Sequence, residues 1–169
     1  MVTGGAGFIG SALVRLLHAD GHRIVTLDAL TYAGSLNNLA DVIDDERHEF
    51  VEGSICDRQL VDGLLREHRP NRLINVAAET HVDRSIDGPD AFIETNVVGT
   101  SRLLAAVRAH TAESGDALRY VQVSTDEVYG TIDDGAFREG DPYRPNSPYA
   151  ASKAAADHMV RAYVRTYGL

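Results

Sequence analysis

Short apolar runs alternate along the chain with longer segments in which apolar residues recur every three or four positions. The short runs predict buried strands, and the longer segments predict helices with one apolar face. Strands are expected at 22–28, 49–52, 72–78 and 118–124, after a very short one at 1–3, and helices at 8–20, 57–68, 89–111 and 147–166. This alternation predicts an α/β protein with a parallel sheet covered on both faces, the doubly wound Rossmann arrangement.

Several predicted helix ends carry local signals. Asp57 can cap the helix at 57–68, and Gly21 lies just beyond the end of the first helix. Ser147 and Pro148 suit the cap and first position of the last helix. The strand at 1–3 would be central in such a sheet yet is very short, and no strand follows the last helix. We therefore expect one Rossmann domain, truncated at both ends.

Composition agrees with one ordinary globular domain. The chain has 169 residues, 44% of them apolar, and no apolar run of the roughly 18–20 residues that a membrane span needs. The N-terminus lacks the layout of a signal peptide, and the single Cys56 agrees with a cytoplasmic location. A net charge of −9 argues against nonspecific nucleic-acid binding, which depends on cationic contacts to phosphates. No metal site is expected.

A glycine-rich turn, TGGAGFIG at 3–10, joins the first strand to the first helix. Glycines at 4, 7 and 10 allow a tight turn, close approach of a pyrophosphate, and packing of helix on strand. The helix N-terminus then offers free N–H groups to an anion. Asp28 ends the next strand, where a carboxylate accepts hydrogen bonds from a ribose and disfavours a 2′-phosphate. The pattern predicts an NAD site, and a glycine-rich connector without a ligand is the alternative.

Tyr149 and Lys153 lie four residues apart near the start of the last predicted helix and so share a face. Lys153 is the only lysine beside 15 arginines. For tyrosine to take an alcohol proton near neutral pH, its pKa must fall from about 10 to about 7, which requires roughly 4 kcal/mol. A cation about 4 Å away supplies about that much at an effective dielectric constant of about 20. The alternative is an exposed tyrosine and a surface lysine.

Two adjacent carboxyl groups follow the strand at 118–124, in the segment STDEVYG at 124–130. Neighbouring residues of a strand point to opposite faces, so Asp126 and Glu127 can reach one ligand only where the chain leaves the strand. Gly130 nearby permits such a departure. Two carboxyl groups can divide into an acid and a base when their environments separate their pKa values. The alternative is a polar strand exit whose side chains face water.

Six segments carry a family resemblance and cover nearly the whole chain: TGGAGFIGS (3–11), DALTYAGSLNNL (28–39), AAETHVDRSIDGP (77–89), FIETNVVGT (92–100), STDEVYG (124–130) and SPYAASKAAADH (147–158). On these segments the chain resembles the extended short-chain dehydrogenase/reductase family. STDEVYG is typical of its sugar-nucleotide dehydratases. Related epimerases and decarboxylases share the glycine turn and the Tyr–Lys pair but generally lack Asp at position 126.

The resemblance implies a hydro-lyase of nucleotide-sugar and deoxysugar metabolism. It would convert dTDP-glucose to the 4-keto-6-deoxy sugar nucleotide, with NAD taking and returning a hydride. Tyr149, aided by Lys153, would take the C4 hydroxyl proton. Glu127 would take the C5 proton, Asp126 would protonate the departing C6 hydroxyl, and Thr125 would bind the sugar at O4.

The resemblance also implies the residues that touch each ligand. Thr80 and Thr125 would contact the substrate. The implied cofactor contacts are Gly4, Gly7, Phe8, Ile9, Gly10, Asp28, Leu30, Thr31, Ser54, Ile55, Ala77, Ala78, Glu79, Thr80, Thr95, Tyr149 and Lys153. Ser54 departs from the family, which usually has an Asp that meets the adenine amine, so that contact is weakened or replaced. His81 and Arg84 suit either a substrate contact or a structural role, and Glu79 could equally be structural.

The family's chain is much longer than 169 residues, and its C-terminal part supplies most of the nucleotide-sugar pocket. We therefore expect residues 1–169 to be the NAD-binding domain of a fragment, with the substrate domain outside this chain. Relatives form homodimers through the helices near 89–111 and 147–166. Apolar residues there fit a core or an interface equally well: Phe92, Val97, Leu104 and Val107. Epimerisation or decarboxylation, and an inactive cofactor-binding module, remain alternatives.

Overall fold

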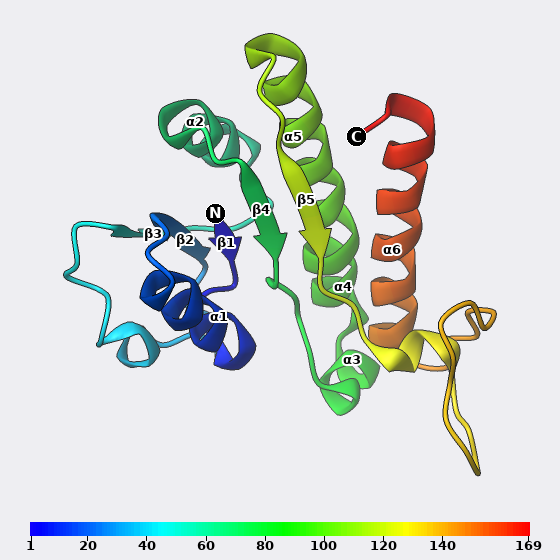
Figure 1. Ribbon diagram of the computed structural model, residues 1–169. Coiled ribbons are helices and arrows are strands. Elements are labelled where there is room, and N and C mark those ends of the chain that lie inside the picture. Colours follow the sequence, from blue (N-terminus) through cyan, green and yellow to red (C-terminus); the bar gives the residue numbers. More distant parts are fainter.

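The computed structural model describes residues 1–169 and confirms the doubly wound Rossmann fold (Figure 1). All strand pairings are parallel, in the order β3-β2-β1-β4-β5. The strands are β1 (Val2–Thr3), β2 (Ile24–Asp28), β3 (His48–Glu52), β4 (Arg72–Asn75) and β5 (Arg119–Gln122). The chain runs outward from β1 to β3 and then returns to β4 on the other side of β1. The point of reversal, between β1 and β4, is where such sheets bind ligands.

Helices cover both faces of the sheet, as predicted. The elements are α1 (Phe8–Ala19), η1 (Leu36–Leu39), α2 (Arg58–His68), α3 (Val82–Asp87), α4 (Pro89–Phe92), η2 (Ile93–Gly99), α5 (Thr100–Ser114), η3 (Asp126–Tyr129) and α6 (Pro148–Tyr167). One face is covered by α1 and η1, and the other by α2 and α5, with α6 packed beside α5 (Figure 1). No helix is both long enough and apolar enough to cross a membrane.

The core consists of two clusters, one on each face of the sheet. Strand β2 contributes to both, because successive side chains alternate between faces. Ile24 joins the cluster beneath α1, whereas Val25 and Leu27 join the cluster beneath α2 and α5. Burial of one such side chain contributes about 1.5–3 kcal/mol. The sequence did not decide whether Phe92, Leu104 and Val107 belong to the core or to an interface. All three are buried within the chain.

The helix predicted at 89–111 is instead three consecutive segments, α4, the π-helix η2 and α5, which together end at Ser114. A π-turn is wider than an α-turn by one residue, and such turns are frequent at functional sites. The apolar spacing of an isolated segment does not reveal them. The short helices α3 and η1 were also not predicted.

The predicted caps are confirmed. The Asp57 side chain accepts a hydrogen bond from the Leu60 N–H at 3.0 Å, and Ser147 Oγ accepts one from the Ala150 N–H at 3.0 Å. Each such cap contributes about 1 kcal/mol. Gly21, with a φ of +85°, follows the end of α1, where the left-handed conformation favours glycine.

Candidate active site

A cleft of about 460 Å³ opens at the carboxyl ends of the strands, where the strand order reverses. Every predicted cofactor residue except Leu30 lines it: Gly4, Gly7, Phe8, Ile9, Gly10, Asp28, Thr31, Ser54, Ile55, Ala77, Ala78, Glu79, Thr80, Thr95, Tyr149 and Lys153. The Leu30 side chain packs against the core cluster beneath α1. Residues from all parts of the chain therefore meet in one cavity.

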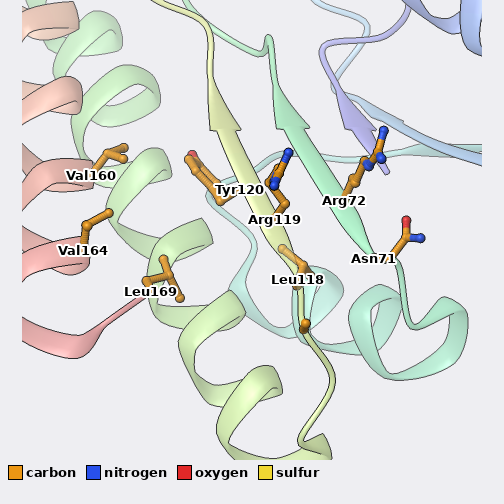
Figure 2. Close-up of a pocket in the computed structure, with 9 residues that line it drawn as sticks. Asn71, Arg72, Leu118, Arg119, Tyr120, Val160, Val164 and Leu169 are labelled. Carbon is orange, nitrogen blue, oxygen red and sulfur yellow. The ribbon is translucent and has the colours of Figure 1, made fainter.

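A second hollow, of about 500 Å³, lies between α6 and β5, the edge strand of the sheet (Figure 2). Its walls include Leu118, Tyr120, Val160 and Val164. This hollow lies toward the amino ends of β4 and β5, whereas ligands of such sheets bind at the carboxyl ends of the strands. It contains none of the predicted site residues, so the cleft at the carboxyl ends is the candidate site.

The glycine turn is shaped by close backbone packing. A Cβ on Gly10 would overlap the Gly4 carbonyl oxygen, and a Cβ on Gly4 would lie 2.6 Å from the Ala77 nitrogen. Gly4 also has a φ of +68°. Gly7 precedes α1 and provides no side-chain cap, so the N–H groups of the first turn stay available to an anion. These residues fit a dinucleotide pyrophosphate.

Asp28 holds the loops around the cleft. Its carboxylate accepts hydrogen bonds from the Ala6 N–H at 2.8 Å and the Leu30 N–H at 2.9 Å. A Cβ on Gly34 would lie 2.7 Å from Asp28 Oδ1, so the loop after β2 also packs closely against the carboxylate. A carboxylate has about four acceptor sites. Two bonds to the protein therefore leave capacity for the predicted ribose contact.

Tyr149 and Lys153 both line the cleft, which confirms that they share a face of α6. Lys153 is only 4% exposed, and its Nζ donates a hydrogen bond to the Val123 carbonyl oxygen at 2.7 Å. The surface-lysine alternative is therefore wrong. Burial lowers the pKa of the Lys153 ammonium, and the Asp157 carboxylate opposes this effect. The Tyr149 ring packs edge-on against Phe92, with ring centroids 6.3 Å apart.

The chain leaves β5 after Gln122, and the predicted acid and base lie in the following 3-10 turn, η3. Thr125 Oγ1 accepts a hydrogen bond from the Glu127 N–H at 3.3 Å, which caps this turn. Asp126 is exposed and Glu127 half-buried. Ser124 lines the cleft, whereas Thr125, Asp126 and Glu127 follow it in the chain and are not part of the cleft wall. The catalytic roles of these three residues stay predictions.

Asn96, on the π-helix η2, braces the loop after β4 and was not singled out from the sequence. Its side chain accepts a hydrogen bond from the Glu79 N–H at 2.8 Å and donates to the Glu79 carbonyl oxygen at 3.0 Å. It also donates to Ser152 Oγ on α6 at 2.8 Å. The neighbouring Thr95 lines the cleft. The π-helix therefore joins the loop after β4 to α6, the helix that carries Tyr149.

Tyr32 links the loops on two sides of the cleft. Its hydroxyl donates to the Thr80 carbonyl oxygen at 3.0 Å and accepts from the Thr80 N–H at 3.3 Å. The Arg84 guanidinium lies over the Tyr32 ring, 3.6 Å from its centroid, and the His81 ring lies 5.8 Å away. Both His81 and Arg84 therefore pack against Tyr32.

Several residues of the cleft wall were not predicted: Leu27, Ala29, Ala33, Gly34, Gly53, Val76, Val123 and Ser124. Four of them directly follow the ends of β2, β3, β4 and β5, namely Ala29, Gly53, Val76 and Val123. Ligands gather at the carboxyl ends of parallel strands. Accurate strand ends would therefore have identified these four, whereas the other positions carry no comparable local signal.

A parallel sheet with a glycine turn at its reversal point, and a Tyr–Lys pair on the last helix, defines a Rossmann domain equipped for dinucleotide chemistry. The model of the GDP-mannose 4,6 dehydratase family matches residues 1–169. The chain belongs to this family.

Individual relatives agree with this assignment. The chain is 58% identical, over its whole length, to a dTDP-glucose 4,6-dehydratase of Xanthomonas campestris, and 49% identical to one of Neisseria meningitidis, and it covers 50% of each protein. The solved structure of DesIV, a dTDP-glucose 4,6-dehydratase of Streptomyces venezuelae with NAD and TYD bound, superimposes with a TM-score of 0.91. That match has 51% identity and covers 99% of this chain and 52% of DesIV.

More distant relatives share the fold but are named for epimerisation and not for dehydration. A UDP-glucose 4-epimerase of Thermus thermophilus, in complex with NAD, superimposes with a TM-score of 0.88 at 36% identity. The match covers 99% of this chain and 51% of the epimerase. The chain spans about half the length of the curated relatives it matches.

Proposed function

We propose that the protein containing this chain is a dTDP-glucose 4,6-dehydratase that uses NAD. The observation that carries the proposal is the hydrogen bond from Lys153 Nζ to the Val123 carbonyl oxygen. It joins the helix of Tyr149 to the strand exit that leads into Asp126 and Glu127, which supports the assignment of both sets of groups to one site. The 58% identity to a curated dTDP-glucose 4,6-dehydratase supports this reaction over others of the family.

The first chemical task is removal of a proton from the sugar C4 hydroxyl. Tyr149 takes this proton as the phenolate and becomes a phenol. The buried ammonium of Lys153, one helical turn away, stabilises the phenolate that acts as the base. NAD bound in the cleft would supply the hydride chemistry, as acceptor of the C4 hydride and donor of that hydride to C6. Thr125 donates a hydrogen bond to the sugar O4.

The second task is loss of water across C5 and C6. The ketone at C4 makes the C5 proton acidic, and Glu127 takes it as base. Asp126 gives its proton to the C6 hydroxyl as the C6–O bond breaks, so water leaves and a C5–C6 double bond forms. The two adjacent carboxyl groups thus act as base and acid. C5 regains a proton when C6 receives the hydride, which completes the 4-keto-6-deoxy product.

An isotope experiment on the complete protein tests this sequence of steps. With dTDP-glucose deuterated at C4, the product should be lighter by one water and carry the deuterium at C6. Mass spectrometry gives the loss of water, and NMR gives the position of the label. Loss of the label to solvent, or a product that retains the water, would contradict the proposal.

Epimerisation at C4 is the second candidate, because UDP-glucose 4-epimerases share the fold. Asp126→Asn separates the two reactions. As general acid–base catalysis contributes about 10²–10⁴-fold, the dehydratase should lose water about 10²-fold more slowly in this variant. An epimerase would be nearly unaffected. Asp133→Asn, at an exposed acid in the loop after η3, is the matched control and should leave turnover unchanged.

We also propose that the complete protein is a homodimer through α6 and the three consecutive helical segments α4, η2 and α5 at 89–114. The family resemblance and the exposed apolar Ile93 on η2 support this. Phe92, Leu104 and Val107 are buried in the core, so the contact would use the outward-facing side chains instead. Sedimentation of the complete protein should give the mass of two chains, and a single-chain mass would contradict the proposal.

A further inference from the structure

Helix α6 holds the exit of β5 at two points, one helical turn apart. Lys153 Nζ donates to the Val123 carbonyl oxygen at 2.7 Å, and Ser124 Oγ donates to Asp157 Oδ2 at 2.6 Å. Val123 and Ser124 are adjacent on the strand exit, and Lys153 and Asp157 are four residues apart on the helix. The two bonds therefore form a matched pair, of which the proposed mechanism uses only the lysine.

Asp157 also joins a third segment to this pair. The Tyr143 hydroxyl, from the loop before α6, donates to the same Asp157 oxygen at 2.9 Å. Burial, together with the hydrogen bond and charge of Asp157, raises the pKa of Tyr143 to about 12, so the phenol remains a donor. The Tyr143 ring packs edge-on against Tyr129 at the end of η3, with centroids 5.3 Å apart. Asp157 thus contacts both the strand exit and the loop that supports η3.

We propose that Asp157 is a positioning residue, which acts through Ser124 to hold Thr125, Asp126 and Glu127 at a set distance from Tyr149. The Val123 N–H donates to the Asn75 carbonyl oxygen at 3.0 Å and Lys153 holds the Val123 carbonyl oxygen, so the chain is held as far as Val123. The bond from Ser124 to Asp157 extends this restraint by one residue toward Thr125. Thr125 follows Ser124 directly in the chain. A carboxylate acceptor suits this task because hydrogen bonds to charged groups are shorter and stronger than neutral ones.

This inference rests on the proposed function, and kinetics of the complete protein test it. Ser124→Ala and Asp157→Ala should each lower kcat about ten-fold or more at nearly constant KM, because a displacement of about 1 Å can cost about 10²-fold in rate. Ser124→Thr keeps the hydroxyl and should retain most of the activity. Tyr143→Phe removes the other hydrogen bond to the same oxygen and should stay within about two-fold of the unmodified protein.

The double variant decides whether the two residues act together. If Ser124 works through Asp157, the loss in the Ser124→Ala/Asp157→Ala double variant should equal that of either single variant. Losses that multiply would show that the two side chains act independently, which would overturn the proposal. The proposal would also be overturned if Tyr143→Phe lowered kcat as much as Ser124→Ala does. The loss would then depend on how Asp157 is packed and not on its bond to Ser124.

A second readout needs neither substrate nor turnover. Amide hydrogen exchange of residues 125–129 should be faster in Ser124→Ala and Asp157→Ala than in the unmodified protein or Tyr143→Phe. Unchanged exchange would refute the positioning role. If the unmodified protein loses no water from dTDP-glucose, the proposed function fails, while the exchange measurement still decides whether Asp157 holds the segment.

Discussion

At the scale of single residues, the glycine turn has no room for a side chain at Gly4 or Gly10. These are two of the glycines whose spacing identifies the turn in the sequence. Gly4 needs a left-handed φ and approaches Ala77 closely, and Gly10 faces the Gly4 carbonyl oxygen directly. In contrast, a Cβ on Gly63 of α2 would meet no atom within 4 Å. Close packing therefore requires glycine at position 10 but not at position 63, although both glycines lie within a helix that glycine disfavours.

Alanine substitutions make this difference measurable. Gly10→Ala should lower the free energy of unfolding by about 1–3 kcal/mol, because the new methyl group overlaps backbone that cannot move away cheaply. It should also weaken NAD binding. Gly63→Ala should instead raise the free energy of unfolding by about 0.5–1 kcal/mol, because alanine favours the helix and meets no neighbour. Urea titration and calorimetry with NAD check both; a Gly10→Ala protein as stable as the parent would contradict the packing argument.

At the scale of elements, the candidate site depends on segments that tie strand exits to helices and to one another. The π-helix η2 joins the loop after β4 to α6 through Asn96, and Tyr32 joins the loop after β2 to the loop after β4. The second link lies beside the cleft, since Thr31 on one loop and Thr80 on the other both line it. We therefore expect this link to slow the release of a bound dinucleotide.

Tyr32→Phe tests the link between the two loops. The variant keeps the ring beneath Arg84 but loses both hydrogen bonds to Thr80, each worth about 1 kcal/mol. NAD should then dissociate about ten-fold faster, with a smaller change in the association rate. Stopped-flow displacement of NAD measures the rate. Tyr163→Phe, on α6 and outside the cleft wall, is the control; equal dissociation rates in the two variants would show that the Tyr32 link does not retain the cofactor.

At the scale of the whole molecule, the candidate cleft is assembled from residues that range from Gly4 to Lys153. The chain nevertheless spans about half the length of its curated relatives, and the family resemblance assigns most of the nucleotide-sugar pocket to the other half. Binding of the cofactor and turnover of the sugar should therefore be separable properties.

The 169-residue chain by itself should bind NAD but show weak or no turnover of dTDP-glucose. The reason is that the glycine turn and Asp28 lie within the chain, whereas most expected contacts to the nucleotide sugar do not. Calorimetry with NAD, alongside a turnover assay, separates the two properties. Substantial dehydration by residues 1–169 alone would contradict this division, and the complete protein provides the positive control.

The strands, the long helices outside 89–114 and the local signals of the site could be predicted from the sequence alone. The strands, the caps at Asp57 and Ser147, the glycine turn, and the shared face of Tyr149 and Lys153 all follow from residues within about one or two helical turns of each other. Such patterns depend on steric and hydrogen-bonding rules between near neighbours in the chain, which do not require the rest of the fold. The Rossmann arrangement followed from the alternation of these elements.

Which distant residues meet depends on the fold as a whole and could not be predicted from local patterns. Ser124 and Asp157 are separated by 33 positions, and Tyr32 and Thr80 by 48. Their contacts depend on the strand order, the rotation of α6 about its axis and the π-turn at Asn96, none of which a local pattern encodes. The burial of Phe92, Leu104 and Val107 was decided in the same way, because an apolar stripe on a helix is equally suited to a core and to an interface until its neighbours are in place.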